Sequence, residues 1–241
     1  MKIHPDTFGL YLTDAHRGRN VTHIIERDDG HINANPNSTH TYFSSHHDWP
    51  QPEQQAIAHA QGTVLDVGCG AGRHSLYLQE QGHRVLAADI SPLAAQVAGE
   101  RGVKHAIVAD ASTIAPDERI DTILLLGNGL GVFGTPENAT AQLTRYHGFT
   151  GSEATMIMDT VDPHATTNPS HTAYHRRNIK NNRLIGQIRL RHRYEVYASP
   201  WFDFFMASLD EAHGILEGTG WTIQETIAAG DPHYWMIIRK N

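Results

Sequence analysis

The stretch that decides the fold class is Val64-Leu65-Asp66-Val67-Gly68-Cys69-Gly70-Ala71-Gly72. Its first residues are apolar and β-branched, as in a buried strand, and residues 73–81 follow with the spacing of a helix. Glycines let a backbone turn sharply and approach a ligand closely, and a helix amino end offers unpaired N–H groups and a positive dipole. A glycine-rich loop between a strand and a helix therefore predicts a nucleotide-binding turn.

Strand-like and helix-like segments alternate around this turn. The predicted strands cover residues 63–67, 84–88, 105–109, 120–126 and 153–158, and the predicted helices cover residues 52–62, 73–81, 92–101 and 136–146. Apolar strands that alternate with helices are typical of a parallel sheet that is covered on both faces. The carboxyl ends of such strands are where these sheets bind ligands.

The pattern changes after residue 159. Residues 187–197 alternate like a half-exposed antiparallel strand, and residues 208–217 predict a helix with a capping box of Ser208 and Glu211. Two further strands are predicted at residues 221–228 and 233–239. We therefore expect an α/β fold: a Rossmann-like, doubly wound, mostly parallel sheet with an antiparallel terminal strand and a substrate-covering insertion.

Length and composition fit one domain. The 241 residues are 39% hydrophobic, which is enough for a sizeable core. We expect a single domain over residues 1–241 with four parts. These are an N-terminal cover segment (1–50), a cofactor-binding core (51–159), a substrate-cover insertion (160–207) and a C-terminal helix with two strands (208–241).

The composition also excludes several classes of protein. A net charge of −7 argues against tight, non-specific binding to nucleic acid. One cysteine and the absence of a His-Glu-x-x-His motif give no recognisable metal site, despite 18 histidines. No apolar run approaches the roughly 20 residues of a membrane helix, and the first residues lack a secretory pattern. We expect a cytoplasmic protein without a metal.

Two classes of cofactor compete for the glycine-rich turn. A dinucleotide fingerprint, Gly-x-Gly-x-x-Gly, would need glycine where this chain has Arg73. Asp66 also precedes the first glycine, and its carboxylate would repel a pyrophosphate but would attract an ammonium group. S-adenosylmethionine (SAM) has that ammonium and no phosphate. The turn therefore favours SAM, with S-adenosylhomocysteine (SAH) as product, over a dehydrogenase cofactor.

Two more acids follow predicted strands. Asp89 ends the second strand, where a carboxylate can accept from both ribose hydroxyls, and Ile90 comes next. Asp110 ends the third strand and can accept from the adenine amino group, with the Ala111 N–H beside it. The alternative interpretation of each acid is a helix cap or a loop turn.

Residues 65–72 and 88–92 together resemble the class I SAM-dependent methyltransferases. More narrowly, the chain resembles a group of bacterial methyltransferase-domain proteins of unassigned small-molecule substrate. That resemblance is carried by Glu26-Arg27-Asp28-Asp29-Gly30, Leu125-Leu126-Gly127-Asn128, Gly186-Gln187 and Pro200-Trp201-Phe202-Asp203. It implies a SAM site on Asp66, Gly68, Gly70, Asp89 and Asp110, with Tyr42 placed to close over the methionine end. We add Ile90, Ala111 and Asn128 to the predicted cofactor-binding set.

Methyl transfer requires alignment of the reactants and, for some nucleophiles, removal of a proton. Asn128 lies at the end of the fourth strand, but the Pro-Pro-aromatic sequence of family members that methylate base amines does not follow it. His171 and His175 would share one helix face, with Tyr174 between them. We expect the catalytic residues among His171, His175, Tyr174 and Asn128. The alternative interpretation is that the two histidines are simply solvated or hydrogen-bonded.

A basic run lies in the same insertion. It contains Arg176, Arg177, Lys180, Arg183, Arg189, Arg191 and Arg193. The run could meet RNA, or its alternating arginines could line the solvent face of one strand. We expect methyl transfer to an N or O nucleophile of a small molecule, by a monomer or homodimer without nucleic-acid or membrane partners. The alternatives are an RNA methyltransferase and a SAM-binding protein without turnover.

Overall fold

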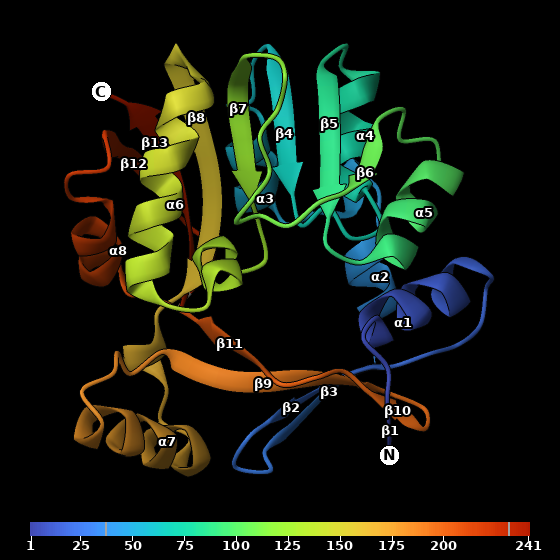
Figure 1. The fold of residues 1–241 in the computed structure, drawn as a ribbon, viewed down its shortest axis with the longest axis vertical. Helices are drawn as coiled ribbons and strands as arrows, with labels where there is room; N and C mark the ends of the chain where they lie inside the picture. Colours follow the sequence, from blue (N-terminus) through green and yellow to red (C-terminus); the bar gives the residue numbers. More distant parts are fainter. Residues whose placement is uncertain (37, 231) are drawn as a thin grey trace. The chain divides into compact units, whose positions relative to one another are not determined.

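A computed structural model describes residues 1–36, 38–230 and 232–241 (Figure 1). These residues form two compact units. The first unit contains residues 1–49, 63–114 and 189–202, and the second contains residues 50–62, 115–188 and 203–241. Among the described residues, no helix has the length and apolar character needed to cross a membrane.

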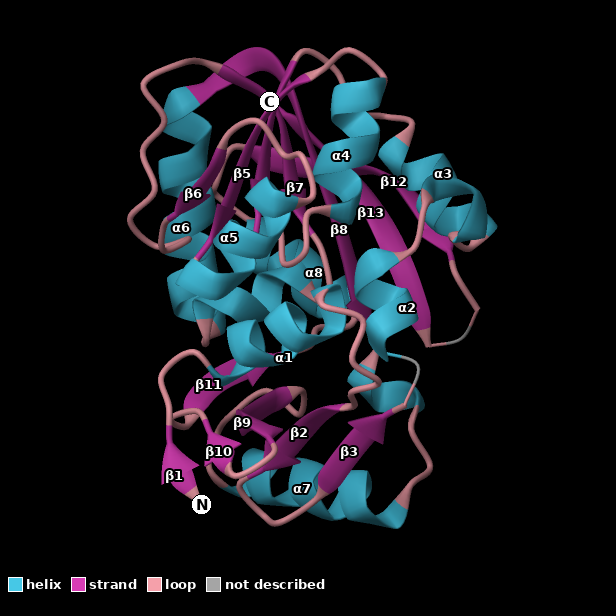
Figure 2. Cartoon of the chain, turned by 90° about the vertical axis from the view of Figure 1, so that its right-hand side faces the viewer, coloured by secondary structure: helices cyan, strands magenta, loops and turns pink. Residues whose placement is uncertain are grey.

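The first unit contains the parallel strands β4 to β6 and a second, mostly antiparallel sheet. Its elements are β1 (Lys2–Ile3), α1 (Thr7–His16), β2 (His23–Arg27), β3 (Ile32–Asn35), α2 (Ser38–Phe43), the 3₁₀ helix η1 (His46–Asp48), β4 (Thr63–Val67), α4 (Arg73–Glu80), β5 (Arg84–Asp89), α5 (Pro92–Glu100), β6 (Ala106–Val108), most of β9 (Gln187–Tyr194) and β10 (Tyr197–Ala198). Strands β4, β5 and β6 are parallel neighbours, and α4 and α5 pack against β5. Figure 2 shows the other sheet, in the order β1-β10-β9-β2-β3.

Local sequence explains how these elements begin and end. Ser91 caps α5, because its side chain accepts from the Ala94 N–H at 2.9 Å. A tight turn at residues 28–30 joins the antiparallel strands β2 and β3. The core of the unit includes Tyr11 and Leu12 of α1, which packs on α5.

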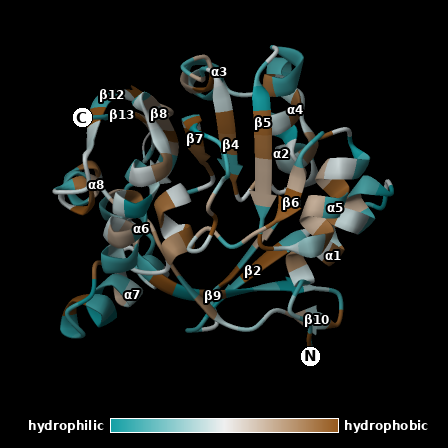
Figure 3. Cartoon of the chain, turned by 45° about the horizontal axis from the view of Figure 1, so that its top comes forward, coloured by the Kyte–Doolittle hydropathy of each residue, from teal (hydrophilic) through white to brown (hydrophobic). Residues whose placement is uncertain are grey.

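The second unit surrounds a mixed four-stranded segment of sheet in the order β12-β13-β8-β7. Its elements are α3 (Gln51–Ile57), β7 (Ile120–Leu125), η2 (Gly129–Phe133), α6 (Pro136–Phe149), β8 (Thr150–Val161), η3 (Pro163–Ala165), α7 (Pro169–Lys180), most of β11 (Phe202–Phe205), α8 (Leu209–Leu216), β12 (Trp221–Ala228) and β13 (His233–Lys240). Strands β7 and β8 are parallel, whereas β13 is antiparallel to both β8 and β12. In Figure 3, much of β7 has the colour of hydrophobic residues and much of α7 that of hydrophilic residues.

Most core elements agree with the sequence predictions, and the differences have physical causes. Strands β4 and β12 have the predicted bounds. Helix α1 was not predicted, because its buried face includes Thr7 and Gly9, which obscure an apolar period. Strand β8 extends beyond residues 153–158, because polar residues at both ends also pair. Residues 169–180 form a polar helix, α7, in which only Tyr174 and Asn178 are buried.

The capping box of α8 permits a test of the fold. Ser208 Oγ accepts from the Glu211 N–H at 3.3 Å, and the Glu211 carboxylate accepts from the Ser208 N–H at 2.7 Å. Ser208→Ala should lower the free energy of unfolding by about 1 kcal/mol, measured by urea denaturation. Ser45→Ala is the matched control, because Ser45 precedes η1 without a side-chain capping bond. Equal destabilisation by both variants would contradict this role for the box.

Candidate functional site

The glycine-rich turn joins β4 to α4 in the first unit. Gly68, Gly70 and Gly72 have φ values of 77°, 54° and 75°, in the left-handed region that favours glycine. A Cβ atom at Gly72 would lie 2.7 Å from Val103 Cγ2, so this glycine is required for packing. Around the Cβ position of Gly68, by contrast, no atom of the described residues lies within 4 Å. The turn therefore presents open backbone at Gly68, with room for a ligand.

Asp89 joins this turn to the start of α5. Its Oδ2 accepts from the Gly70 N–H at 2.9 Å, and its Oδ1 accepts from the Ser91 N–H at 2.9 Å. The side chain is buried, and burial raises its pKa to about 6, although both hydrogen bonds oppose that shift. Each carboxylate oxygen can accept a second hydrogen bond. Asp89 is thus held rigidly with acceptor capacity left for two hydroxyl groups.

Asp66 lies at the end of β4 and is 2% exposed. Its Oδ2 accepts from the Ser75 hydroxyl at 2.6 Å, which ties it to α4. Burial raises the pKa of this carboxyl group, and nearby His74 partly offsets the rise. Within the part of the chain that is described, Oδ1 has no hydrogen-bond partner. A cation beside Oδ1 would offset the cost of burying the carboxylate.

The predicted adenine-binding residues lie beside β5 and β6. Ile90 is 67% exposed immediately after Asp89, which pairs in register with Val108 of β6. Asp110 Oδ1 accepts hydrogen bonds from both the N–H and the hydroxyl of Ser112 at 2.7 Å, as expected of an acid in a loop turn. These two bonds leave the other carboxylate oxygen of Asp110, Oδ2, for a ligand. Ala111 follows Asp110 in the same turn.

Tyr42 of α2 lies over the glycine-rich turn, because a Cβ at Gly70 would be 3.8 Å from its Cδ1. Its hydroxyl is 3.4 Å from His23 Nδ1, and His23 Nε2 is 2.8 Å from His192 Nδ1. Desolvation lowers the pKa of His23 to about 3 and that of His192 to about 4, so both rings are neutral near pH 7. The sequence analysis missed this histidine pair, because its members lie 169 positions apart.

Asn128 belongs to a second cluster, in the other unit. It has a left-handed conformation with φ 63°, and its Oδ1 accepts from the Val161 N–H at 3.0 Å. Asp159 Oδ1 accepts from the Gly127 N–H at 2.6 Å, and Asp159 Oδ2 lies 3.4 Å from the Asn128 nitrogen. Oδ2 is also 2.8 Å from His233 Nε2. Sequence analysis identified Asn128 but not the partnership of Asp159 with His233.

The other predicted catalytic residues lie on α7. Tyr174 is 2% exposed, and the Arg177 guanidinium lies 4.1 Å from the centre of its ring. His171 Nδ1 is 3.3 Å from the Thr166 hydroxyl, and His175 is half-buried. Tyr174 therefore packs within its own unit, and a catalytic role for each of the three stays a prediction.

Several members of the basic run are engaged in pairs. Arg191 Nε lies 2.8 Å and Arg193 Nε 3.7 Å from Glu26 Oε2. Arg183 is 3.9 Å from Asp203, and Arg191 also lies over the Trp201 ring at 4.4 Å. These pairs neutralise part of the charge that an RNA backbone would need. Within the described ranges, no group of three or more histidine, cysteine or acidic side chains could hold a metal.

The site resembles those of known proteins. A family model described as a methyltransferase domain matches residues 64–147, which include the glycine-rich turn, Asp89 and Asn128. A SAM-dependent methyltransferase from Bacteroides fragilis, solved in complex with SAH, is 27% identical, with 99% of this chain and 98% of that chain covered and a TM-score of 0.81. Residues 64–147 thus resemble a methyltransferase domain, and the whole chain has the class I SAM-dependent methyltransferase fold. The predicted fold class is thereby confirmed.

The curated relatives that this chain matches carry the names of two different methyltransferases. A 2-heptyl-1-hydroxyquinolin-4(1H)-one methyltransferase from Mycobacteroides abscessus is 40% identical over 87 residues, or 31% of this chain and 37% of that protein. A malonyl-[acyl-carrier protein] O-methyltransferase from Salmonella typhimurium is 39% identical over 59 residues, or 24% of each protein. The chain thus spans between about a quarter and two fifths of the length of the curated relatives that it matches. CcbJ from Streptomyces caelestis shares the fold at 11% identity, with 83% of this chain and 99% of that chain covered and a TM-score of 0.61.

Proposed function

We propose that this protein transfers the methyl group of SAM to a nitrogen or oxygen nucleophile of a small molecule. The observation that carries the proposal is the rigid Asp89 carboxylate, bonded to the Gly70 and Ser91 N–H groups at 2.9 Å each beside the open turn at Gly68. Asp66, whose residue is 2% exposed, adds a second carboxylate oxygen, Oδ1, that accepts no hydrogen bond from the described residues. A ribose diol and an ammonium group satisfy both acids, whereas a pyrophosphate satisfies neither.

Each predicted cofactor residue has a role in this proposal. Asp66 accepts from the ammonium group, Asp89 accepts from the ribose hydroxyls, and Tyr42 covers the methionine end. The exposed Ile90 side chain packs on the adenine face. The remaining contacts are backbone groups of Gly68, Gly70 and Ala111, the second oxygen of Asp110, and the Asn128 amide.

The reaction requires the protein mainly to align the reactants. SAM supplies a methyl group on a sulfonium that leaves as a neutral thioether. The protein's residues must hold the acceptor atom in line with that methyl group and remove its proton where it has one. Asn128, His171, Tyr174 and His175 are the proposed acceptor-side residues. The Mycobacteroides abscessus relative, which is named as a 2-heptyl-1-hydroxyquinolin-4(1H)-one methyltransferase, supports a small heteroaromatic acceptor. The ion pairs of Glu26 with Arg191 and Arg193 favour a small acceptor over RNA.

The test is transfer of label from methyl-labelled SAM to a panel of hydroxylated and N–H heteroaromatic compounds. We expect labelled product in the organic phase that depends on the protein and is suppressed by SAH. Binding of SAH without label transfer to any acceptor would support the alternative of a SAM-binding protein without turnover. A protein that neither binds SAH nor transfers label would contradict the proposed function. A cytoplasmic location and a monomeric or homodimeric state remain proposals from the sequence.

A further inference from the structure

The Asp159–His233 pair lies at the turn that follows β7. Asp159 Oδ2 is 2.8 Å from His233 Nε2, and the same carboxylate accepts from the Gly127 N–H at 2.6 Å. Asn128 completes the turn, because its Oδ1 accepts from the Val161 N–H at 3.0 Å. Three separate segments of the second unit therefore fix the position of the pair: the end of β7, the end of β8 and the start of β13.

The hydrogen bond to Asp159 determines which ring nitrogen of His233 is available. Asp159 is an acceptor, so the Nε2 atom of His233 carries the hydrogen in the neutral ring, and Nδ1 carries a lone pair. Among the described residues, His233 Nδ1 has no hydrogen-bond partner. The His233 side chain is 36% exposed, whereas that of Asp159 is 8% exposed. The pair thus consists of a buried orienting carboxylate and an accessible basic nitrogen.

The position of the pair suits a reacting group. In parallel sheets the ligand lies beyond the carboxyl ends of the strands, and Gly127 and Asn128 directly follow β7 at that end. Gly127 and Asn128 have φ values of 74° and 63°, and left-handed conformations outside glycine cluster at functional sites. The turn directs two N–H groups at Asp159 and leaves the Asn128 Nδ2 atom without a partner in the described part of the chain.

We propose that His233, oriented by Asp159, is the general base of the reaction, and that the acceptor therefore carries a proton on its attacking N or O atom. This inference rests on the proposed methyl transfer. As the attacking atom bonds to the methyl carbon, the electron pair of the carbon–sulfur bond returns to sulfur, and the acceptor proton moves to His233 Nδ1. The resulting imidazolium is stabilised by Asp159 and releases the proton to solvent. No oxidant or further reactant is needed.

The electrostatic surroundings support this role. The hydrogen bond to Asp159 raises the pKa of His233, burial partly opposes the rise, and the Asp159 and Glu53 carboxylates add to it. The Trp235 ring, whose centre lies 5.9 Å from that of the His233 ring, is uncharged. A base must be unprotonated to act. The rate should therefore increase as the pH rises through a pKa above 6.5 and reach a plateau at higher pH.

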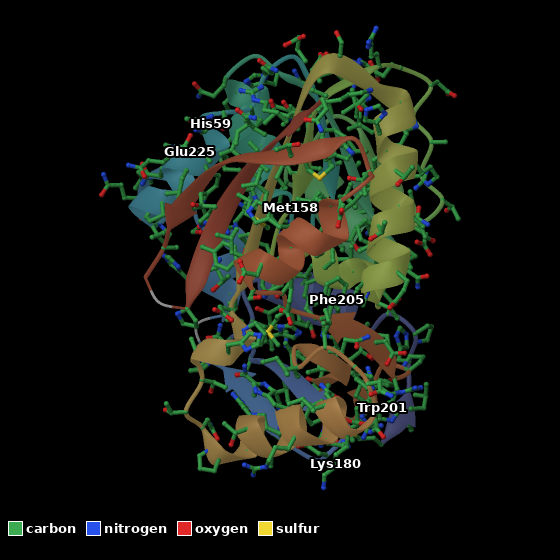
Figure 4. The ribbon with its side chains drawn as sticks, turned by 90° about the vertical axis from the view of Figure 1, so that its left-hand side faces the viewer. His59, Met158, Lys180, Trp201, Phe205 and Glu225 are labelled. Atoms are coloured by element: carbon green, nitrogen blue, oxygen red, sulfur yellow. The ribbon has the colours of Figure 1, made fainter. Side chains whose placement is uncertain are left out.

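The test compares His233→Gln with His59→Gln. Glutamine can still donate a hydrogen bond to Asp159 but cannot take a proton, so it separates a base from a structural partner. His59 forms another histidine–carboxylate pair, with Glu225 at 3.6 Å, elsewhere in the same unit (Figure 4). Label transfer from SAM would be measured from pH 5.5 to pH 9 with two probes of similar shape. Quinolin-4-ol has a proton to lose, and quinoline has none.

We expect label in the quinolin-4-ol product, a loss of about a hundredfold or more in kcat for His233→Gln, and loss of the low-pH limb of its rate profile. The SAH affinity of both variants should stay within twofold of the wild-type value. The kcat of His59→Gln should also stay within twofold of the wild-type kcat. Undiminished transfer by His233→Gln, or preferential methylation of quinoline, would overturn the inference while leaving the proposed function intact. Transfer to neither probe by a protein that binds SAH would overturn the protic-acceptor assignment. Failure to bind SAH would count against the proposed function itself.

Discussion

Replacing Asp89 with alanine should weaken the binding of SAH about a hundredfold. The carboxylate offers acceptor sites to two ribose hydroxyls, and hydrogen bonds to a charged group contribute about 1.5–3 kcal/mol each. The same change also removes the acceptor for the Gly70 and Ser91 N–H groups, so the glycine-rich turn loses two hydrogen bonds that fix its conformation. Isothermal titration calorimetry at pH 8, above the pKa of about 6 raised by burial, measures the effect with the carboxylate ionised.

Two further variants separate charge from folding. Asp89→Asn keeps one acceptor oxygen and should retain more affinity than alanine. Asp117→Asn removes the same charge from an exposed position of the chain and should leave affinity unchanged. Thermal unfolding of each variant reports whether the fold is intact. Wild-type affinity in a folded Asp89→Ala protein would show that the nucleoside does not bind at Asp89.

On acidification from pH 7 to pH 5, two buried histidines that resist protonation should together lower the free energy of unfolding of the first unit by about 4 kcal/mol. The folded pKa values, lowered by burial to about 3 for His23 and about 4 for His192, lie below the ordinary 6.5. Below pH 6.5 the unfolded chain therefore binds protons that the folded chain does not. Each histidine lowers the free energy of unfolding by about 2 kcal/mol at pH 5. This free energy falls further with decreasing pH until the pH reaches the folded pKa.

The measurement is urea unfolding as a function of pH. A His23→Phe, His192→Phe double variant should have a flatter profile between pH 5 and pH 7, whereas His47→Gln, at an 81% exposed side chain, should follow the wild type. Asp89 in the first unit and His233 in the second contribute with the opposite sign. The raised pKa of each group adds stability at low pH that is lost as the pH rises through the folded value. Identical slopes for wild type and double variant would rule out the buried pair as the cause.

The parts of the fold that were predictable have short-range causes. The apolar run of β4, the glycines and α4 occur within residues 63–80, and their order alone implies a ligand-binding turn. The Ser208–Glu211 capping box is equally local and was predicted correctly. Helix α7 was less evident, because its residues are mostly polar and only Tyr174 and Asn178 are buried. A polar helix has no apolar period to detect.

The candidate site likewise contains residues that the local sequence predicted and residues that it did not. Asp66 and Asp89 were predicted because each ends a strand next to the glycine-rich turn. The partners that determine their chemistry were harder to predict. His192 lies on an alternating strand, but nothing nearby in the sequence indicates that it meets His23, 169 positions away. His233 approaches Asp159 from 74 positions away, because β13 returns antiparallel to β8. Such pairs depend on strand register rather than on local pattern.

The most direct test of the central claim is a crystal structure of the protein with bound SAH. We expect both ribose hydroxyls within hydrogen-bond distance of the Asp89 carboxylate, and the ammonium group beside Asp66 Oδ1. Saturating SAH with no density at the Gly68–Gly72 turn, or a dinucleotide pyrophosphate bound there instead, would contradict the account.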